Sequence, residues 1–497
     1  MPLSAFNDGK SNGCNNRKYA EISNFYDTMK IVTIKSILWF FVIMLIALNF
    51  PLQVYFNSPL PSISPYLLLS VILALDLATA AINRLLRWNI TQPIDLVITI
   101  FVILVLFQTG WQMLLNYVSV DQGISAIVIF IFPVIFFIYF RNAFTENEIR
   151  SILFSMALAG LIVGGYFAYD SISKLVFGEL PEYAMKAHVY SIERSGQTME
   201  ESNVARISLG ARSMGLLDKH TVSAAWISIG CFAALSLLSF RAIRTRILAI
   251  SLYGALLFLG LNFTGIVGFL LVVFLVEFRG YDVLRGVIDR KSLLKLIFSM
   301  SVFTAVLFII SAFTDFKLIQ VIQEISEVQY DVASGTQVTR DDGLGYLGGL
   351  LSDLASFPIN MLQFPPGFLI GDGFTPGFGV VEKGGDYGFV ETLHRLGLPL
   401  FLVIFIGLIS LIRRSLRQIR FLDRTENSNA RYLQFASCVT AYLLFSEIHY
   451  TVWNAKSILP IFFLCLAIFS SYLSPPRRRN SKIVASAPIP AKCKSDP

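Results

Sequence analysis

The sequence predicts an all-α polytopic membrane protein, and three observations support this prediction. Hydrophobic residues make up 55% of the 497 residues and charged residues only 15%, a composition too apolar for a soluble protein of this length. Apolar runs long enough to cross a bilayer recur along the chain. The Lys and Arg residues fall in short clusters between these runs, a pattern typical of the signals that orient membrane helices. The net charge of +7 therefore gives no support for nucleic-acid binding.

Twelve apolar runs are candidate membrane spans, since a bilayer core needs about 20 apolar residues per helix. The first run follows a polar N-terminal tail, residues 1–30, without a small-residue cleavage site, so we expect it to be retained as a helix. Only the sequence NFTG, at 262–265, separates the seventh run from the eighth. The predicted spans lie near 31–50, 65–83, 93–110, 123–140, 151–169, 222–239, 245–261, 264–278, 388–412, 432–448 and 457–473, with one more at 294–313.

Charge along the chain predicts which ends of these helices face the cytoplasm. Basic residues cluster in alternate connections, for example 279–295 and 413–431, whereas the short connections opposite carry no Lys or Arg. By the positive-inside rule both termini are cytoplasmic. We therefore expect one transmembrane domain over 31–474, followed by a disordered cytoplasmic tail over 475–497.

Two long polar segments, 170–221 and 314–387, then face the opposite side of the membrane. The titratable groups gather on this outward side, because each of the four histidines falls in or beside an outward segment. These histidines are His188, His220, His394 and His449.

The candidate catalytic residues lie where the longer polar segment meets the tenth span, in the sequence GGDYGFVETLHRLGLPLF at 384–401. Glu391, His394 and Arg395 are spaced i, i+3 and i+4, so they share one helix face near the outer membrane surface. Ionisable residues at this depth usually line a cavity or pair with one another. Asp386 precedes the helix, either as its N-cap or as an acid–base group. The alternative for Glu391 and Arg395 is an ion pair that only stabilises the helix.

A glycine- and proline-rich stretch, FPPGFLIGDGFTPGFG at 364–379, precedes this helix. Its glycines and prolines exclude a long regular element, and its phenylalanines favour burial or contact with lipid. We interpret the stretch either as a lid over an amphiphilic substrate or as a loop packed on the helix bundle by its own aromatic side chains.

Candidate anion-binding residues end the shorter polar segment, in the sequence VARISLGARSMGLLDKH at 204–220. The planar guanidinium groups of Arg206 and Arg212 suit phosphate oxygens, although ordinary solvated charges balanced by nearby acidic residues are the alternative. Glu447 and His449 end the eleventh span on the same side, and either could join the cluster on the tenth helix. P-loop, HExxH, GxSxG and DxD motifs are absent, so an ATPase, a zinc protease, a serine hydrolase and a metal-dependent nucleotide-sugar transferase lack support.

The twelve spans, the large outward segment and three motifs resemble the O-antigen polymerase and ligase superfamily. The resemblance implies a metal-independent glycosyltransferase of GT-C-like helical fold that needs no cofactor. Its substrate would be an oligosaccharide linked to undecaprenyl pyrophosphate at the outer face of the bacterial inner membrane, with the lipid bilayer and a chain-length regulator protein as partners. The motifs are ARSMGLLDKHTVSAAW at 211–226, FTGIVGFLLVVF at 263–274 and GGDYGFVETLHRLGLPLFL at 384–402.

The resemblance also implies roles for individual residues. Arg212 and Arg340 match the pyrophosphate-binding arginines of the family, and Arg395 and Arg206 are further candidates for the same role. Asp386, Glu391 or His394 would take the proton of the acceptor hydroxyl. No residue is expected to bind a metal.

The same resemblance separates a polymerase from a ligase. Asp386 and Tyr387 stand where ligases usually have a His-Asn pair, which favours a polymerase. The Ser-Arg pair that often precedes the glycine of the eighth helix is missing, since Asn262 and Phe263 occupy that region. The alternatives are an O-antigen ligase, a transporter or flippase of glycolipids, and a non-catalytic membrane scaffold.

Overall fold

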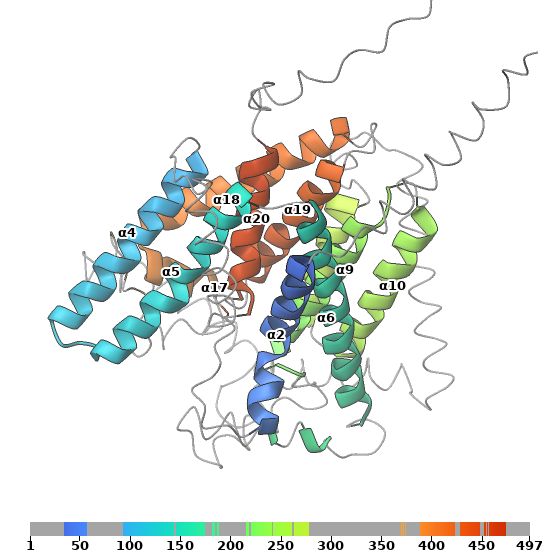
Figure 1. Cartoon of the computed structure of the whole chain (residues 1–497), viewed down its shortest axis with the longest axis horizontal. Coiled ribbons are helices and arrows are strands. Elements are labelled where there is room, and N and C mark those ends of the chain that lie inside the picture. The colour runs from blue at the N-terminus through green and yellow to red at the C-terminus, as the bar shows by residue number, and fades with distance from the viewer. Residues whose placement is uncertain are drawn as a thin grey trace, which may run out of the picture.

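The computed structural model describes a helical bundle (Figure 1). Of the described residues 89% are helical and none lies in a strand. The described residues are 34–56, 93–143, 146–173, 181–183, 186–187, 215–217, 220–240, 242–260, 263–277, 369, 371, 373, 388–422, 428–447, 452–453, 455 and 457–473.

Most of the described helices are apolar, whereas α17 carries Glu391, His394 and Arg395. Four of the described helices, α4, α6, α9 and α18, are long and apolar enough to cross a membrane. The bounds are α2 Ile34–Phe56, α4 Pro93–Leu114, α5 Val120–Ala143, α6 Glu146–Ile172, α9 His220–Leu237, α10 Ile243–Leu259, α11 Phe263–Val272, the π-helical η2 Val273–Glu277, α17 Gly388–Leu396, α18 Leu398–Leu422, α19 Ser428–Ser446 and α20 Leu459–Tyr472.

Ten of the twelve predicted spans coincide with these helices, and most boundaries agree within a few residues. Two helices, α10 and α11, do meet in this region, but α11 begins at Phe263 and so contains the last three residues of NFTG. The predicted spans at 65–83 and 294–313 lie outside the described residues. The all-α prediction is therefore confirmed for the described residues, while the total of twelve spans and the GT-C-like fold stay predictions.

α6 and α9 form the centre of the bundle. They approach closely where Gly160 faces Gly230, since a Cβ added to either glycine would lie 2.7 Å from the Cα of the other. Small residues allow such contact between membrane helices. α2 and α10 pack on α6 through hydroxyl groups: Ser151 Oγ donates to the Ser36 carbonyl at 2.6 Å, and Tyr253 Oη donates to the Ala157 carbonyl at 2.7 Å.

α19 connects this centre to the rest of the bundle, because it packs on α9, α18 and α20. α20 packs on α5, and α5 lies beside α4 at one side of the molecule (Figure 1). α18 exposes a row of large apolar side chains, Leu402, Ile406 and Ile409, of which Ile406 is 62% exposed. Such a face suits contact with lipid.

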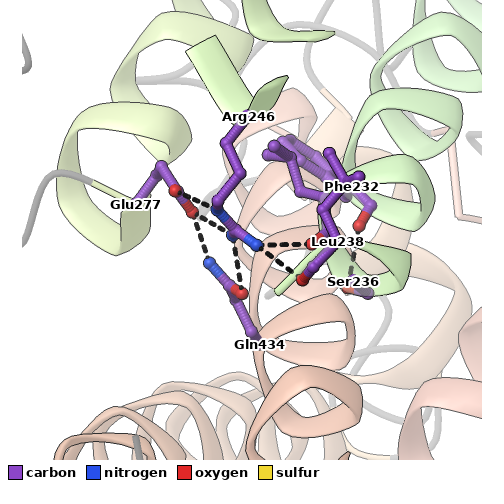
Figure 2. A network of polar contacts seen from close by, with 7 residues as sticks. Phe232, Ser236, Leu238, Arg246, Glu277 and Gln434 are labelled. Carbon is purple, nitrogen blue, oxygen red and sulfur yellow. Dashed lines mark hydrogen bonds and ion pairs between the residues drawn. The ribbon is translucent and has the colours of Figure 1, made fainter. Parts of the chain in front are cut away.

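The bundle has two ends with different polar groups. At one end, which we call the Arg246 end, a buried network joins α10, η2 and α19 (Figure 2). Arg246 Nε and Nη2 each donate to the Glu277 carboxylate at 2.6 Å, and Gln434 Nε2 donates to the same carboxylate at 2.5 Å. Arg246 Nη1 also donates to the Leu235 and Leu238 carbonyls, at 2.6 and 3.1 Å, and so caps the end of α9.

The opposite end, which we call the α17 end, gathers α17, the last residues of α19 and the first turns of α9 and α20. Trp226 Nε1 of α9 donates to Ser457 Oγ, just before α20, at 3.2 Å. The segment Gly215–Leu217 is held at the start of α9, because Tyr183 Oη donates to the Leu216 carbonyl at 2.6 Å. The Gly215 N–H also points to Asp170 Oδ2, at 3.4 Å.

Candidate functional site

The predicted tenth helix is broken in the structure, and the break shapes the site. A single helix over 388–412 is wrong, because α17 ends at Leu396 and α18 begins at Leu398. Gly397 between them has φ +74°, a left-handed conformation that glycine adopts without strain. Its N–H donates to the Leu393 carbonyl at 2.8 Å and closes α17, while Pro399 suits the first turn of α18, where its missing N–H costs nothing.

The break is covered by residues of the glycine-rich stretch. Gly371 lies so close that an added Cβ would be 2.4 Å from the Arg395 carbonyl and 2.6 Å from the Gly397 nitrogen. Gln108 of α4 donates through Nε2 to the same Arg395 carbonyl at 3.1 Å. Gly373 packs on Gln108 and Gln112. At these glycines the stretch is packed on the helices; most of 364–379, including its phenylalanines, lies outside the described residues, so both of its interpretations stay predictions.

Glu391, His394 and Arg395 share α17, and the structure places two of them in one ion pair. Arg395 donates through Nε and Nη2 to Glu391 Oε1, at 3.0 and 2.5 Å. Both side chains are partly buried, with 26% and 14% of the Glu391 and Arg395 side chains exposed. His394 is more deeply buried, at 4% exposed. This is the ion pair that the alternative interpretation of Glu391 and Arg395 predicts, and a role of these residues in catalysis or substrate binding stays a prediction.

A second polar group, formed by Thr392, Glu447 and Trp453, joins α17 to the end of α19. Thr392 Oγ1 donates to Glu447 Oε2 at 2.6 Å, and Trp453 Nε1 donates to Thr392 Oγ1 at 3.1 Å. The Phe389 N–H, in the first turn of α17, donates to the Glu447 carbonyl at 2.7 Å. This bond satisfies one of the N–H groups that a helix start leaves without an intrahelical partner.

Glu447 is the first residue after α19, and its carboxyl group is almost fully buried, with 7% of the residue exposed. Its second oxygen, Oε1, makes no hydrogen bond within the described part of the chain. Burial raises the pKa of Glu447 to about 8, although the Thr392 hydroxyl acts in the opposite direction. The nearby Glu391 carboxylate raises this pKa further, whereas the Val452 N–H and Arg395 lower it.

Thr392, Glu447 and Trp453 close one end of an apolar cavity of about 360 Å³. The cavity extends between α4, α18, α19 and α20 as far as Arg414 of α18. From Phe401 to Arg414 the axis of α18 rises by roughly 20 Å. Its walls are apolar, with Ile98, Phe101, Phe405, Leu408, Leu443 and Phe463 among the lining residues.

This arrangement suits a molecule with a polar head and an apolar chain. The head would contact the polar groups at the α17 end, and the chain would follow α18. A buried carboxyl group at the head can also accept or release a proton, which is the requirement for acid–base chemistry.

The sequence predicted only part of this site. Of the predicted residues, Glu391, His394 and Arg395 are described, whereas Asp386, Arg206, Arg212 and Arg340 lie outside the described residues, so their proximity stays a prediction. Glu447 was recognisable as an acidic residue ending an apolar run. Its pairing with Thr392 was not, because the two residues are 55 positions apart and nothing in their local pattern links them.

The fold and the site together define a class: a protein whose described residues are almost all helical, with helices long and apolar enough to cross a membrane and a polar group at the end of an apolar cavity. No protein-family model matches the chain, and no curated protein matches it.

Proposed function

We propose that the protein polymerises oligosaccharide repeat units linked to undecaprenyl pyrophosphate, at the outer face of the bacterial inner membrane. The product would be O-antigen, capsule or exopolysaccharide. The observation that carries the proposal is the polar group of Thr392, Glu447 and Trp453 at the end of the apolar cavity. A lipid-linked sugar likewise has an apolar part and a polar part, because its hydrocarbon chain is joined to a charged and hydroxylated head.

The cavity supports a role in holding the lipid. Its volume of about 360 Å³ is enough for the part of an isoprenoid chain nearest the pyrophosphate. The walls contributed by α18 lie beside the exposed apolar row of the same helix, so a chain entering from the bilayer would stay in apolar surroundings throughout.

The pyrophosphate would bind arginine side chains at the α17 end. Arg395 lies on α17, and Arg212 precedes the segment Gly215–Leu217 by three positions. Arg340 and Arg206 complete the predicted set. Fixed positive charges of this kind stabilise the charge that develops on a leaving pyrophosphate, as a metal ion does in other transferases.

The proposed reaction is a displacement at an anomeric carbon. A hydroxyl group of the lipid-linked acceptor repeat attacks the reducing-end sugar of the growing glycan, a new glycosidic bond forms, and the bond to the lipid pyrophosphate breaks. The hydroxyl proton passes to a base, for which Asp386, Glu391 and His394 are the candidates from the sequence.

The test uses the purified full chain in lipid vesicles with undecaprenyl-pyrophosphate-linked repeat units, without metal or nucleotide. We expect a ladder of longer lipid-linked glycans on a gel. A product that forms only after a lipid A-core acceptor is added would indicate a ligase. Repeats that cross the bilayer without growing would indicate a transporter, and either result would contradict the proposed polymerase.

A further inference from the structure

Two of the carboxyl groups described at the α17 end, those of Glu391 and Glu447, differ in how their oxygens are occupied. Glu391 Oε1 accepts two hydrogen bonds from Arg395, so this carboxylate is held in an ion pair. Glu447 Oε2 accepts one hydrogen bond from Thr392, while Glu447 Oε1 makes none within the described part of the chain. Glu447 also lines the apolar cavity, and the residues lining that cavity do not include Glu391.

The direction of the hydrogen bonds identifies the oxygen that can handle a proton. An indole N–H is only a donor, so Trp453 must donate to Thr392 Oγ1, and the Thr392 hydroxyl proton then lies toward Glu447 Oε2. Oε2 is thus occupied as an acceptor. Oε1 is the oxygen that remains to take up a proton.

We propose that Glu447 is the catalytic base of the transfer reaction: Glu447 Oε1 accepts the proton of the acceptor hydroxyl at the end of the apolar cavity. This inference rests on the proposed polymerase function and names a base outside the set that the sequence predicted. Thr392 and Trp453 are positioning residues, because they hold the carboxyl group through Oε2 and leave Oε1 available to react.

The step balances in atoms and charge. The acceptor O–H bond breaks and its proton forms a bond to Glu447 Oε1, so the carboxylate becomes a carboxylic acid. The acceptor oxygen bonds to the anomeric carbon, and the bond from that carbon to the pyrophosphate oxygen breaks. The electron pair leaves with the lipid pyrophosphate, which is stable as an anion and needs no proton. The acid then returns its proton to water.

The electrostatic surroundings of Glu447 suit a base. Its pKa of about 8 lies close to the working pH, where general-base catalysis is most effective. Among the described residues, two charged groups act on it, and both are on α17: Glu391 raises the pKa and Arg395 lowers it. Glu391 is instead held in an ion pair with Arg395.

The test compares Glu447→Gln with the wild-type full chain in lipid vesicles containing undecaprenyl-pyrophosphate-linked repeats. The side-chain amide of the Glu447→Gln variant would still accept the Thr392 hydrogen bond but cannot take up a proton at neutral pH. We expect kcat to fall by roughly 10²- to 10⁴-fold, with KM changed far less. The wild-type rate should rise with pH and level off above about pH 8, and the variant should lack this dependence.

The matched control is Glu182→Gln, the same chemical change at an exposed carboxylate paired with Lys186. It should leave rate and pH profile unchanged. Glu447→Asp, which keeps a carboxylate at a slightly different position, should retain more activity than Glu447→Gln. If Glu447→Gln matches the wild type while the wild type makes a ladder, Glu447 is not the base and the proposed polymerase stands. If the wild type makes no ladder, the proposed polymerase fails and the base role fails with it.

A second measurement needs no variant and no turnover. Dicyclohexylcarbodiimide modifies protonated carboxyl groups in apolar surroundings, and peptide mass spectrometry locates the modified residue. We expect modification of Glu447, declining as the pH rises past about 8 and blocked by the lipid-linked repeat. Absence of modification at Glu447 would overturn the inference even if Glu447→Gln failed to fold.

Discussion

The two ends of the bundle each contain a buried carboxylate, and they use it differently. At the Arg246 end, every guanidinium nitrogen of Arg246 donates a hydrogen bond, to Glu277, Gln434 or the carbonyls at the end of α9 (Figure 2). At the α17 end, Glu447 has one oxygen bound by Thr392 and one oxygen without a hydrogen bond within the described part of the chain.

The difference separates a structural group from a reactive one. A buried charge is costly unless it is paired and hydrogen-bonded, and the Arg246 network meets that requirement within the protein. Glu447 meets it only in part, and it lies on a cavity that a ligand can fill. We infer that the first carboxylate holds helices together, and that the second is kept available for a substrate.

The largest expected effect is the loss of Glu277 from the Arg246 network. Glu277→Ala leaves the Arg246 guanidinium buried, at 3% side-chain exposure, without its carboxylate. Breaking a buried pair in this way costs about 3–5 kcal/mol, and we expect the free energy of unfolding in detergent to fall by that amount. The control Glu182→Gln, at an exposed pair, should leave the unfolding midpoint in place. If Glu277→Ala were as stable as Glu182→Gln, the network would not stabilise the fold.

A double replacement sharpens the same comparison. Arg246→Met combined with Glu277→Met removes both charges and fills the space with apolar side chains. Since well-packed apolar residues often replace a buried ion pair at little cost, the double variant should recover most of the stability lost in Glu277→Ala. It should also make a glycan ladder. A double variant that is stable but inactive would show that this network does more than hold helices together.

The sequence predicted the helices far better than the contacts between them. The length of an apolar run and the position of charges are local signals, so α4, α6 and α9 could be located to within a few residues. The break at Gly397 was missed because a single glycine in LHRLGLPLF does not by itself end a helix, and the close approach of Gly371 to this position is visible only in the structure.

The site was predictable where its residues are close in sequence. The i, i+4 spacing of Glu391 and Arg395 predicted their ion pair. The bonds from Thr392 to Glu447 and from Trp453 to Thr392 join residues 55 and 61 positions apart, and they depend on how α17 packs on α19. Such contacts follow from tertiary packing, which periodicity along one helix does not encode.

Glu447→Gln should affect stability in a pH-dependent way, unlike any change at the Arg246 end. The folded-state pKa of Glu447, about 8, lies above the ordinary value of 4.5, so the folded protein keeps this proton at pH values where the unfolded chain has released it. The contribution of Glu447 to stability is thus fully present below pH 4.5 and is lost as the pH rises through about 8. We expect Glu447→Gln to match the wild type near pH 5 and to be the more stable protein at pH 8, by thermal unfolding. A constant difference across this range would contradict the raised pKa.

The smallest expected effect is that of Thr392→Val, which keeps the shape of the side chain and removes two hydrogen bonds, the one donated to Glu447 and the one accepted from Trp453. The Thr392 hydroxyl stabilises the charged form of Glu447 and so lowers its pKa; without it, the pKa rises further above the ordinary value. A single hydrogen bond contributes about 0.5–1.5 kcal/mol, so we expect the transfer rate at pH 7 to fall by roughly two- to tenfold.

The pH profile distinguishes a positioning role of Thr392 from a merely structural one. In Thr392→Val the rising part of the profile should move to higher pH, and most of the lost rate should return there, because the base is intact and only less often ionised. Thr392→Ser keeps the hydroxyl and should retain the wild-type profile. A uniform loss of rate at every pH in Thr392→Val would mean that Thr392 supports the packing of α17 on α19 without changing the pKa of Glu447. The two ends of the bundle would then differ less than their hydrogen bonds indicate.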